Sequence, residues 1–192
     1  AAATTVASRT GSITIGDKTF SITQAGLTGS VTLSPASRTA VAAGESGSVA
    51  VTSNATDYAW TAVSNNAWIT VTSGANSTGN GSVGYTVAAI ATVASRTGSI
   101  TIGDKSFSIT QSGLTGSVTL SSSSVNAAAA GESHTLTVTA NAPDYAWTAV
   151  SNNAWITVTT GASSTGSGSV GYTVAAATTV ASRAGSITIG DK

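Results

Sequence analysis

The sequence contains no cysteine and no methionine. The absence of cysteine excludes disulfide bonds, thiolate nucleophiles and zinc sites built from cysteine ligands. It does not by itself assign the chain to a cellular compartment. Whatever stabilises this chain must therefore come from packing and hydrogen bonds.

Charge is scarce as well. Charged residues make up 7% of the 192 residues, seven basic and seven acidic, whereas an average soluble domain carries about 25%. A neutral chain without basic clusters lacks the electrostatic footprint that attracts nucleic acids or anionic membranes. No apolar run approaches the roughly 18 residues that a membrane-spanning helix needs. We therefore expect no nucleic-acid partner and no membrane insertion.

What the sequence does contain is an internal repeat. Residues 57–72 and residues 144–159 both read DYAWTAVSNNAWITVT. Arg9, Arg96 and Arg183 are separated by 96 − 9 = 87 and 183 − 96 = 87 positions. These spacings predict a repeat with an 87-residue period.

Two GLTG segments, beginning at Gly26 and Gly113, separate strand-like runs and are the predicted unit boundaries. On this division, residues 1–25 are the C-terminal strands of a preceding repeat and residues 29–112 are a complete repeat. Residues 116–192 are then a repeat that lacks its last strand.

Apolar residues alternate with serine and threonine in runs such as SVGYTV and SITI, and helical periodicity is absent. Short strands at intervals of about 8–12 residues are typical of an antiparallel sandwich of about seven strands. The fold class is therefore predicted to be all-β, with tandem immunoglobulin-like antiparallel β-sandwich repeats. Within each repeat, ITIGDKSFSI predicts a hairpin in which Gly103 and Asp104 adopt positive φ, and Ser73–Gly81 is the longest predicted polar loop.

The two tryptophans of each repeat are either core or binding surface. Alternation directs Trp60 inward and Trp68 nominally outward. Burying an aromatic side chain contributes about 4–6 kcal/mol as an upper estimate, compared with a net domain stability of about 5–15 kcal/mol. We therefore favour core filling for the pair. The alternative is a glycan-stacking surface formed by Trp68, Trp155, Asn65 and Asn152.

The groups that catalysis requires are sparse. Asp57, Asp104 and Glu45 are scattered singly, whereas glycoside hydrolysis needs two facing carboxylates and calcium loops need clustered ligands. His134 is the only histidine, and Gly47 occupies its place one period earlier. We predict no catalytic residue, no cofactor-binding residue and no metal ligand, and therefore not an enzyme.

Arg96 and its two equivalents precede the TGSITI or AGSITI strand. The favoured interpretation is structural: the aliphatic stem packs on the sheet and the guanidinium donates to backbone carbonyls. A ligand-binding arginine is the alternative.

The repeat resembles the BACON family of immunoglobulin-like β-sandwich modules. The resemblance lies in YAWTAVSNNAWITVT, GSVGYTV, SRTGSITI and the closing FSITQSG, and it covers essentially the whole repeat. It implies a module of secreted and surface proteins of bacteria and their phages, often found beside carbohydrate-active domains. It also implies two possible roles, carbohydrate binding and simple spacing.

Together these features predict a non-catalytic extracellular or cell-surface structural protein, a stalk, adhesin shaft or filament. The expected partners are other copies of the chain or adjacent repeats; the alternative is a carbohydrate-binding module with glycans as partners. A sharper hypothesis is that the open edge of residues 116–192 accepts a strand from a neighbour, in competition between residues 1–18 and residues 175–192. The alternative is that the chain is a window on a longer array. The candidate donor residues are Thr19, Phe20, Ser21, Ile22, Thr23 and Gln24.

Overall fold

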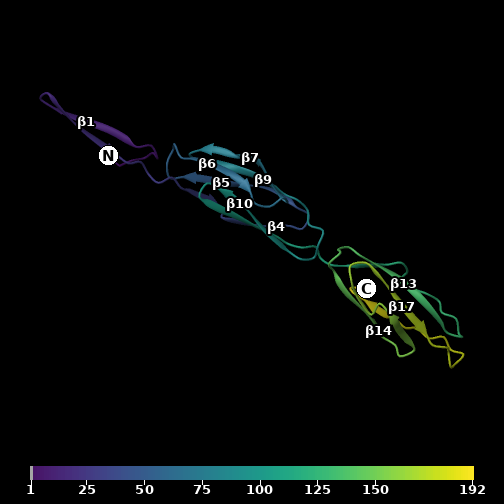
Figure 1. Cartoon of the computed structure of the whole chain (residues 1–192). Helices are drawn as coiled ribbons and strands as arrows, with labels where there is room; N and C mark the ends of the chain where they lie inside the picture. Colours follow the sequence, from purple (N-terminus) through teal and green to yellow (C-terminus); the bar gives the residue numbers. More distant parts are fainter. Residues whose placement is uncertain (1) are drawn as a thin grey trace. The chain divides into compact units, whose positions relative to one another are not determined.

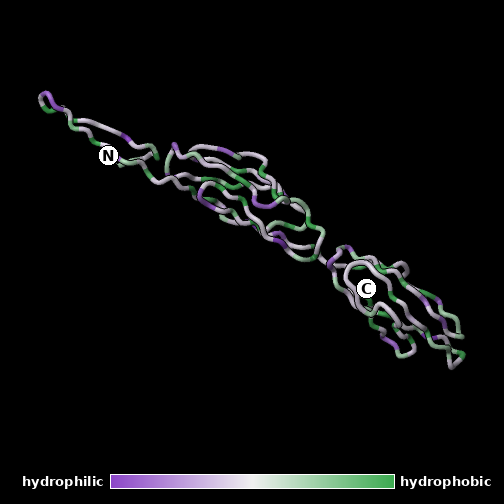
Figure 2. Tube along the Cα trace, in the orientation of Figure 1, coloured by the Kyte–Doolittle hydropathy of each residue, from purple (hydrophilic) through white to green (hydrophobic). Residues whose placement is uncertain are grey.

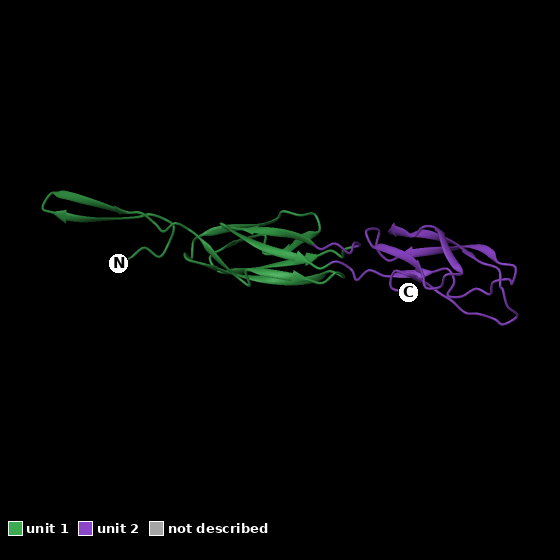
Figure 3. Ribbon diagram, turned by 90° about the horizontal axis from the view of Figure 1, so that it is seen from below, with its two compact units in different colours: residues 1–90, 96–112 green, residues 91–95, 113–192 purple. Residues whose placement is uncertain are grey.

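The computed structural model describes residues 2–192, and every regular element within them is a β-strand. The chain divides into two compact units (Figure 3). Unit 1 comprises residues 1–90 and 96–112, and unit 2 comprises residues 91–95 and 113–192. This confirms the all-β class.

Unit 1 contains a sandwich of two sheets (Figure 1). One sheet has the order β4 (Ser37–Ala40), β11 (Lys105–Gln111), β10 (Arg96–Ile102), β6 (Ala59–Ser64) and β8 (Asn76–Thr78). The other has the order β3 (Val31–Ser34), β5 (Glu45–Ser53), β9 (Gly81–Val87) and β7 (Ile69–Ser73).

Unit 1 also includes a separate two-stranded hairpin, formed by β1 (Arg9–Ile15) and β2 (Lys18–Gln24). The two strands pair only with each other, in seven consecutive register pairs. Every residue of both strands is exposed.

Unit 2 contains a smaller sandwich. One sheet has the order β12 (Val118–Leu120), β13 (Glu132–Ala140), β17 (Gly168–Val174) and β15 (Ile156–Thr160). The other has the order β16 (Ser163–Thr165), β14 (Ala146–Ser151) and β18 (Ile187–Ile189). Among the described residues, unit 2 has no strand in the places that β4 and β11 occupy in unit 1.

Strict alternation places one side of each strand in the core. In β10 and β11, the buried residues are Gly98, Ile100, Ile102, Phe107, Ile109 and Gln111, and the serines and threonines between them are partly or fully exposed. Hydrophobic and weakly polar positions alternate along the strands of unit 1 (Figure 2). The period of two that predicted the strands therefore also forms the core.

Three details of unit 1 differ from the sequence predictions. The sandwich has nine strands rather than about seven. Strands β4 and β8 were not predicted, because they carry no hydrophobic alternation and β8 lies inside the predicted loop Ser73–Gly81. The sandwich is not wholly antiparallel, since β4 pairs parallel to β11. The turn between β10 and β11 needs only one positive φ, at Gly103 (+56°), and Asp104 has a negative φ.

Candidate functional site

The inner tryptophan of each unit is part of the core. Trp60 is 3% exposed, and its indole N–H donates to the carbonyl of Gly79 at 2.8 Å. Trp147 repeats this arrangement with Gly166 at 2.7 Å. Because the one polar atom of each ring is satisfied internally, these two indoles are sealed from any ligand. The inward direction predicted for Trp60 is confirmed.

The outer tryptophan is half-buried and one face of it is covered. Trp68 packs against the core of unit 1, and the guanidinium of Arg96 lies 4.3 Å from its ring centroid. A Cβ on Gly98 would lie 2.6 Å from the same ring, so only glycine allows β10 to pass this closely. Arg183 covers Trp155 at the same distance in unit 2.

Arg96 is held in place by backbone carbonyls, which is the structural role that the sequence favoured. Its Nη2 donates to the carbonyls of Ala88 at 2.9 Å and Ala89 at 3.3 Å. Its Nε donates to Oε1 of Gln111 at 2.8 Å. The guanidinium is thus shared between an aromatic face and three acceptors, a combination that suits the planar geometry of arginine.

The asparagines proposed as glycan contacts have partners within their own units. Asn65 donates to the hydroxyls of Ser99 and Thr101, both at 2.9 Å. Asn152 makes the corresponding bonds to Ser186 and Thr188. The structure therefore places Asn65 beside the loop that carries Trp68, but its amide N–H groups are bonded across to β10. A glycan-contact role for these four residues stays a prediction.

Gln111 is a structural residue that the sequence analysis did not single out. It is completely buried, and its amide donates to the carbonyls of Val41, Ala42 and Ala88 at 3.0–3.3 Å. This one side chain ties the end of β11 to two loops. The signal in the sequence was the closing FSITQ, in which the glutamine shares the parity of the buried phenylalanine and isoleucine.

Isolated aspartates bind backbone amides. Asp57 accepts from the amides of Val6 at 2.7 Å and Ala7 at 3.0 Å, and hydrogen bonding, first from Val6, lowers the pKa of its carboxyl. For Asp144 in unit 2, partial burial by itself acts to raise the pKa of the carboxyl. The hydrogen bonds that it accepts from the amides of Val93 and Ala94 have the larger combined effect, so the pKa is lowered. Residues 91–95 therefore belong to unit 2 although they precede β10 in the sequence.

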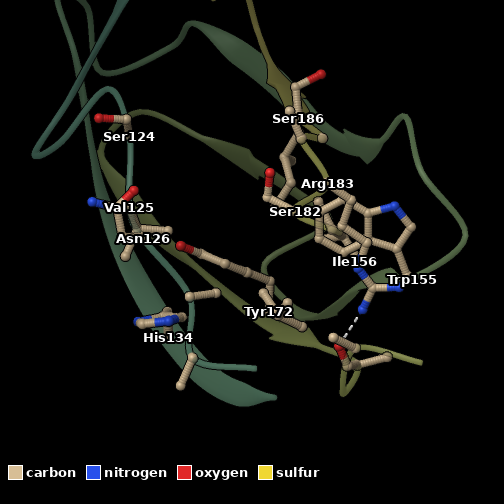
Figure 4. Close-up of a pocket in the computed structure, with 18 of the residues that line it drawn as sticks. Ser124, Val125, Asn126, His134, Trp155, Ile156, Tyr172, Ser182, Arg183 and Ser186 are labelled. Carbon is tan, nitrogen blue, oxygen red and sulfur yellow. Dashed lines mark hydrogen bonds between the residues drawn. The ribbon is translucent and has the colours of Figure 1, made fainter. Parts of the chain in front are cut away.

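Unit 2 contains a groove of about 760 Å³ whose lining includes Leu120, Leu136, Tyr172, Ile187 and Ile189 (Figure 4). In unit 1, the counterpart of Tyr172 is Tyr85, and its ring lies 5.4 Å from the ring of Phe107 in β11. The groove thus occupies the volume that β11 fills in unit 1. The sequence analysis did not identify this cavity.

One wall of the groove carries His134. Its ring lies 5.4 Å from that of Tyr172 (Figure 4). Its Nε2 lies 3.1 Å from Oε1 of Glu132. Glu132 accepts from the amide of Ala128, and this bond, together with the nearby imidazole of His134, lowers the pKa of the glutamate. The cluster contains one imidazole and one carboxylate, which is too little for a metal site.

Across residues 2–192, no group of three or more histidine, cysteine, aspartate or glutamate side chains is placed to hold a metal ion. The same residues include no helix long and apolar enough to cross a membrane.

The chain belongs to the BACON family. The family model of the viral BACON domain matches residues 19–121 and residues 106–191, which together span most of the sequence. BACON is a family of non-catalytic domains. Among curated proteins, none matches the chain.

Solved structures similar to the chain are distant ones. A GH5 xyloglucanase of Bacteroides ovatus, in complex with a XXXG heptasaccharide, is 17% identical with a TM-score of 0.39 and matches over 45% of this chain and 19% of that one. Domains 4 and 5 of the S-layer protein SbsC are 12% identical with a TM-score of 0.34, covering 57% and 58%. A titin tandem is 11% identical with a TM-score of 0.32, covering 95% and 72%. The chain thus spans about a fifth of the xyloglucanase.

Proposed function

We propose that the chain is a non-catalytic structural protein of the extracellular space or cell surface, whose β-sandwich modules form a stalk, adhesin shaft or filament. Membership of a non-catalytic family supports the absence of a reaction. The low charge of the chain, in which 7% of the residues are charged, suits a spacer that attracts neither nucleic acid nor anionic lipid.

The observation that carries this proposal is the use of all four indoles in packing. Trp60 and Trp147 are buried with their N–H groups bonded internally. Trp68 and Trp155 each have a ring face covered by an arginine. A sugar ring that stacked on that face of either outer tryptophan would first have to displace an arginine that donates to backbone carbonyls.

A carbohydrate-binding module is the second candidate, because Trp68 and Trp155 are only half-buried. In that case a glycan would use the ring area that the arginine leaves open, next to Asn65 or Asn152. Stacking on an aromatic ring is a common basis for binding flat, apolar ligand faces.

Titration of the chain with soluble glycans, followed by tryptophan fluorescence, separates the two candidates. We expect no saturable change. The matched variant Arg96→Ala uncovers Trp68 without altering the ring itself, so a glycan site at Trp68 would respond to it with a changed affinity. Saturable quenching that is lost in folded Trp68→Ala and Trp155→Ala variants would contradict the spacer proposal.

A further inference from the structure

Residues 91–95 connect two strands of unit 1 but are held by unit 2. They lie between β9, which ends at Val87, and β10, which begins at Arg96, and both of these strands belong to unit 1. The five residues themselves belong to unit 2 and are drawn in its purple colour (Figure 3). The chain therefore passes between the units after residues 90, 95 and 112, and not only at the linker.

The side chain that holds this segment is Asp144. Its Oδ1 accepts from the amide of Val93 at 2.8 Å, and its Oδ2 accepts from the amide of Ala94 at 3.0 Å. Hydrogen bonds to an ionised acceptor are about twice as strong as bonds between neutral groups. The hydroxyl of Thr92 donates to the carbonyl of Ala94 at 3.1 Å, which stabilises the turn that carries both amides.

The linker contacts the same segment. The amide of Leu114 donates to the carbonyl of Thr92 at 2.8 Å. A Cβ on Gly113 would overlap the carbonyl oxygen of Val93, so only glycine allows the linker to pass this closely. Because the linker already tethers the segment to unit 2, their binding is intramolecular and avoids most of the entropic cost of association.

The same contacts occur one period earlier, within unit 1. Asp57 accepts from the amides of Val6 and Ala7, which precede it by 51 and 50 residues, as Val93 and Ala94 precede Asp144. The amide of Leu27 donates to the carbonyl of Thr5 at 2.8 Å. Residues 5–8 and 92–95 both read TVAS. The arrangement is therefore a property of the repeat and not of one position.

We propose that Asp144, Gly113 and Leu114 form a docking site for the TVAS turn that the preceding sandwich carries between its strands β9 and β10. This inference deepens the proposed structural function, on which it rests, by naming what one module of an array binds: the TVAS turn of the module before it. The connection between β9 and β10 then stabilises the following unit and not the unit whose strands it joins. The site is directional, because in both copies the carboxylate follows the segment that it binds.

The site recognises backbone groups and not side chains. Val93 and Ala94 contribute their amides, and the side chain of Ala94 is exposed. The partner must therefore offer two successive N–H groups in a turn, and a proline at position 94 would remove one of them. Because the acceptor is a carboxylate, an alanine in its place leaves both amides without a partner.

Hydrogen exchange of individual amides in the full chain, followed by NMR, tests the site. Asp144→Ala is expected to accelerate exchange at Val93 and Ala94 by at least about tenfold, because both bonds to the carboxylate are lost. Asp57→Ala is the matched control, since it makes the same change one period earlier. It should accelerate exchange in residues 5–8 and leave Val93 and Ala94 unchanged.

A second variant disturbs the same contact without removing a charge. Gly113→Ala places a methyl group against the carbonyl of Val93, so the linker must move away from the segment. Exchange at Val93 and Ala94 should again accelerate by about tenfold. Slow exchange in β13 reports that unit 2 remains folded in each variant. Gly26→Ala is the control and should act on residues 5–8 alone.

A matched pair of core substitutions shows which unit protects the segment. Val83 and Val170 lie one period apart, and both are 0% exposed. Val170→Ala weakens unit 2 and should accelerate exchange at Val93 and Ala94 by at least about tenfold. Val83→Ala weakens unit 1, which contains the strands on both sides of the segment, and should leave the same two amides unchanged.

Unchanged exchange at Val93 and Ala94 in both Asp144→Ala and Gly113→Ala would overturn the docking site, as would a response to Val83→Ala in place of Val170→Ala. Glycan titration of the same chain keeps this result apart from the proposed function. If the exchange results are as expected and glycans bind saturably, the docking site is supported and the spacer function is overturned. If exchange is unchanged and glycans do not bind, only the docking site is overturned.

Discussion

Units 1 and 2 contain nearly the same residues but bury them to different extents. Ile100 and Ile187 have the same neighbours in sequence, SITI in both, yet Ile100 is fully buried and Ile187 is only half-buried. The same is true of Tyr85 and Tyr172. The difference is strand β11, which covers these residues in unit 1. The difference in burial between these residues is therefore caused by the neighbouring strand and not by the residues themselves.

A second difference concerns the edge strand β4. In unit 1, Arg38 in β4 donates to Glu45 in β5 at 2.7 Å, and this contact lowers the pKa of the glutamate. The equivalent of Arg38 in unit 2 is Val125, which is 50% exposed, and Glu132 instead accepts from the amide of Ala128 and lies 3.1 Å from Nε2 of His134. Without β11 as a pairing partner and without the arginine, the segment around Val125 forms no strand.

The largest expected effect comes from a substitution that opens the core of unit 1, as the core of unit 2 is open at its groove. Phe107→Ala removes the largest fully buried side chain of unit 1 and should destabilise it by about 3–5 kcal/mol through lost burial and a cavity. Hydrogen exchange followed in β5 and β13, whose sequences differ, reports each unit separately. Exchange should accelerate in β5 and stay unchanged in β13.

Phe20→Ala is the matched control, because the same residue in β2 is 61% exposed. At concentrations where the chain is monomeric, this variant should alter the stability of either sandwich by less than about 0.5 kcal/mol. Equal effects of the two substitutions would mean that the hairpin is packed as tightly as β11, contrary to the comparison.

The sequence predicted the strands that alternate and missed those that do not. Strands such as β9 and β10 follow from a period of two and one buried face. Strand β4 reads SRTA and β8 reads NST, and their pairing depends on neighbours that are distant in sequence. Propensity within such short polar segments carries no information about those neighbours.

The site was foreseen in part. Parity alone identified Trp60 as core, and the spacing of Arg96 before its strand indicated a carbonyl-binding role. That Arg96 also covers Trp68 could not be predicted, because it depends on the close passage of Gly98 past the ring. The groove of unit 2 was not predicted from the sequence, because its lining depends on the three-dimensional structure.

The buried glutamine offers the next largest effect. Gln111→Ala leaves the carbonyls of Val41, Ala42 and Ala88 without their donor and Arg96 without one acceptor. The expected loss in unit 1 is about 2–3 kcal/mol, measured from the urea dependence of unfolding. Gln24→Ala, in the exposed strand β2, should cost less than about 0.5 kcal/mol. A smaller loss of stability for Gln111→Ala than for Gln24→Ala would show that water fully replaces the side-chain amide of Gln111.

The two arginines that cover tryptophans should differ by a smaller amount. Arg96→Ala removes a cation–π contact, two carbonyl bonds and the bond to Gln111, for about 1–2 kcal/mol. Arg183→Ala removes the same kind of cation–π contact and two carbonyl bonds in unit 2 but no bond to a glutamine, so a somewhat smaller loss, about 1 kcal/mol, is expected. Denaturation monitored by tryptophan fluorescence measures both. Equal losses would show that Gln111 adds nothing to the arginine.

The smallest difference is expected where the two units have the same local structure. Asp104 accepts from Lys105 and from the amide of Val31, and these bonds, in that order, lower the pKa of its carboxyl. Asp191 has the same two kinds of partner in unit 2, and its pKa is lowered for the same reasons. A carboxyl with a lowered folded-state pKa stabilises the fold fully above its ordinary value of 3.8 and loses that contribution as the pH falls through the folded value.

Asp104→Asn and Asp191→Asn should therefore flatten the acid limb of stability equally in units 1 and 2, as followed by hydrogen exchange between about pH 6 and pH 3. Asp17→Asn is the control, since this 85% exposed residue lies in the turn between β1 and β2. An acid response confined to one unit would mean that the open groove, and not the aspartate, governs the loss of stability in acid.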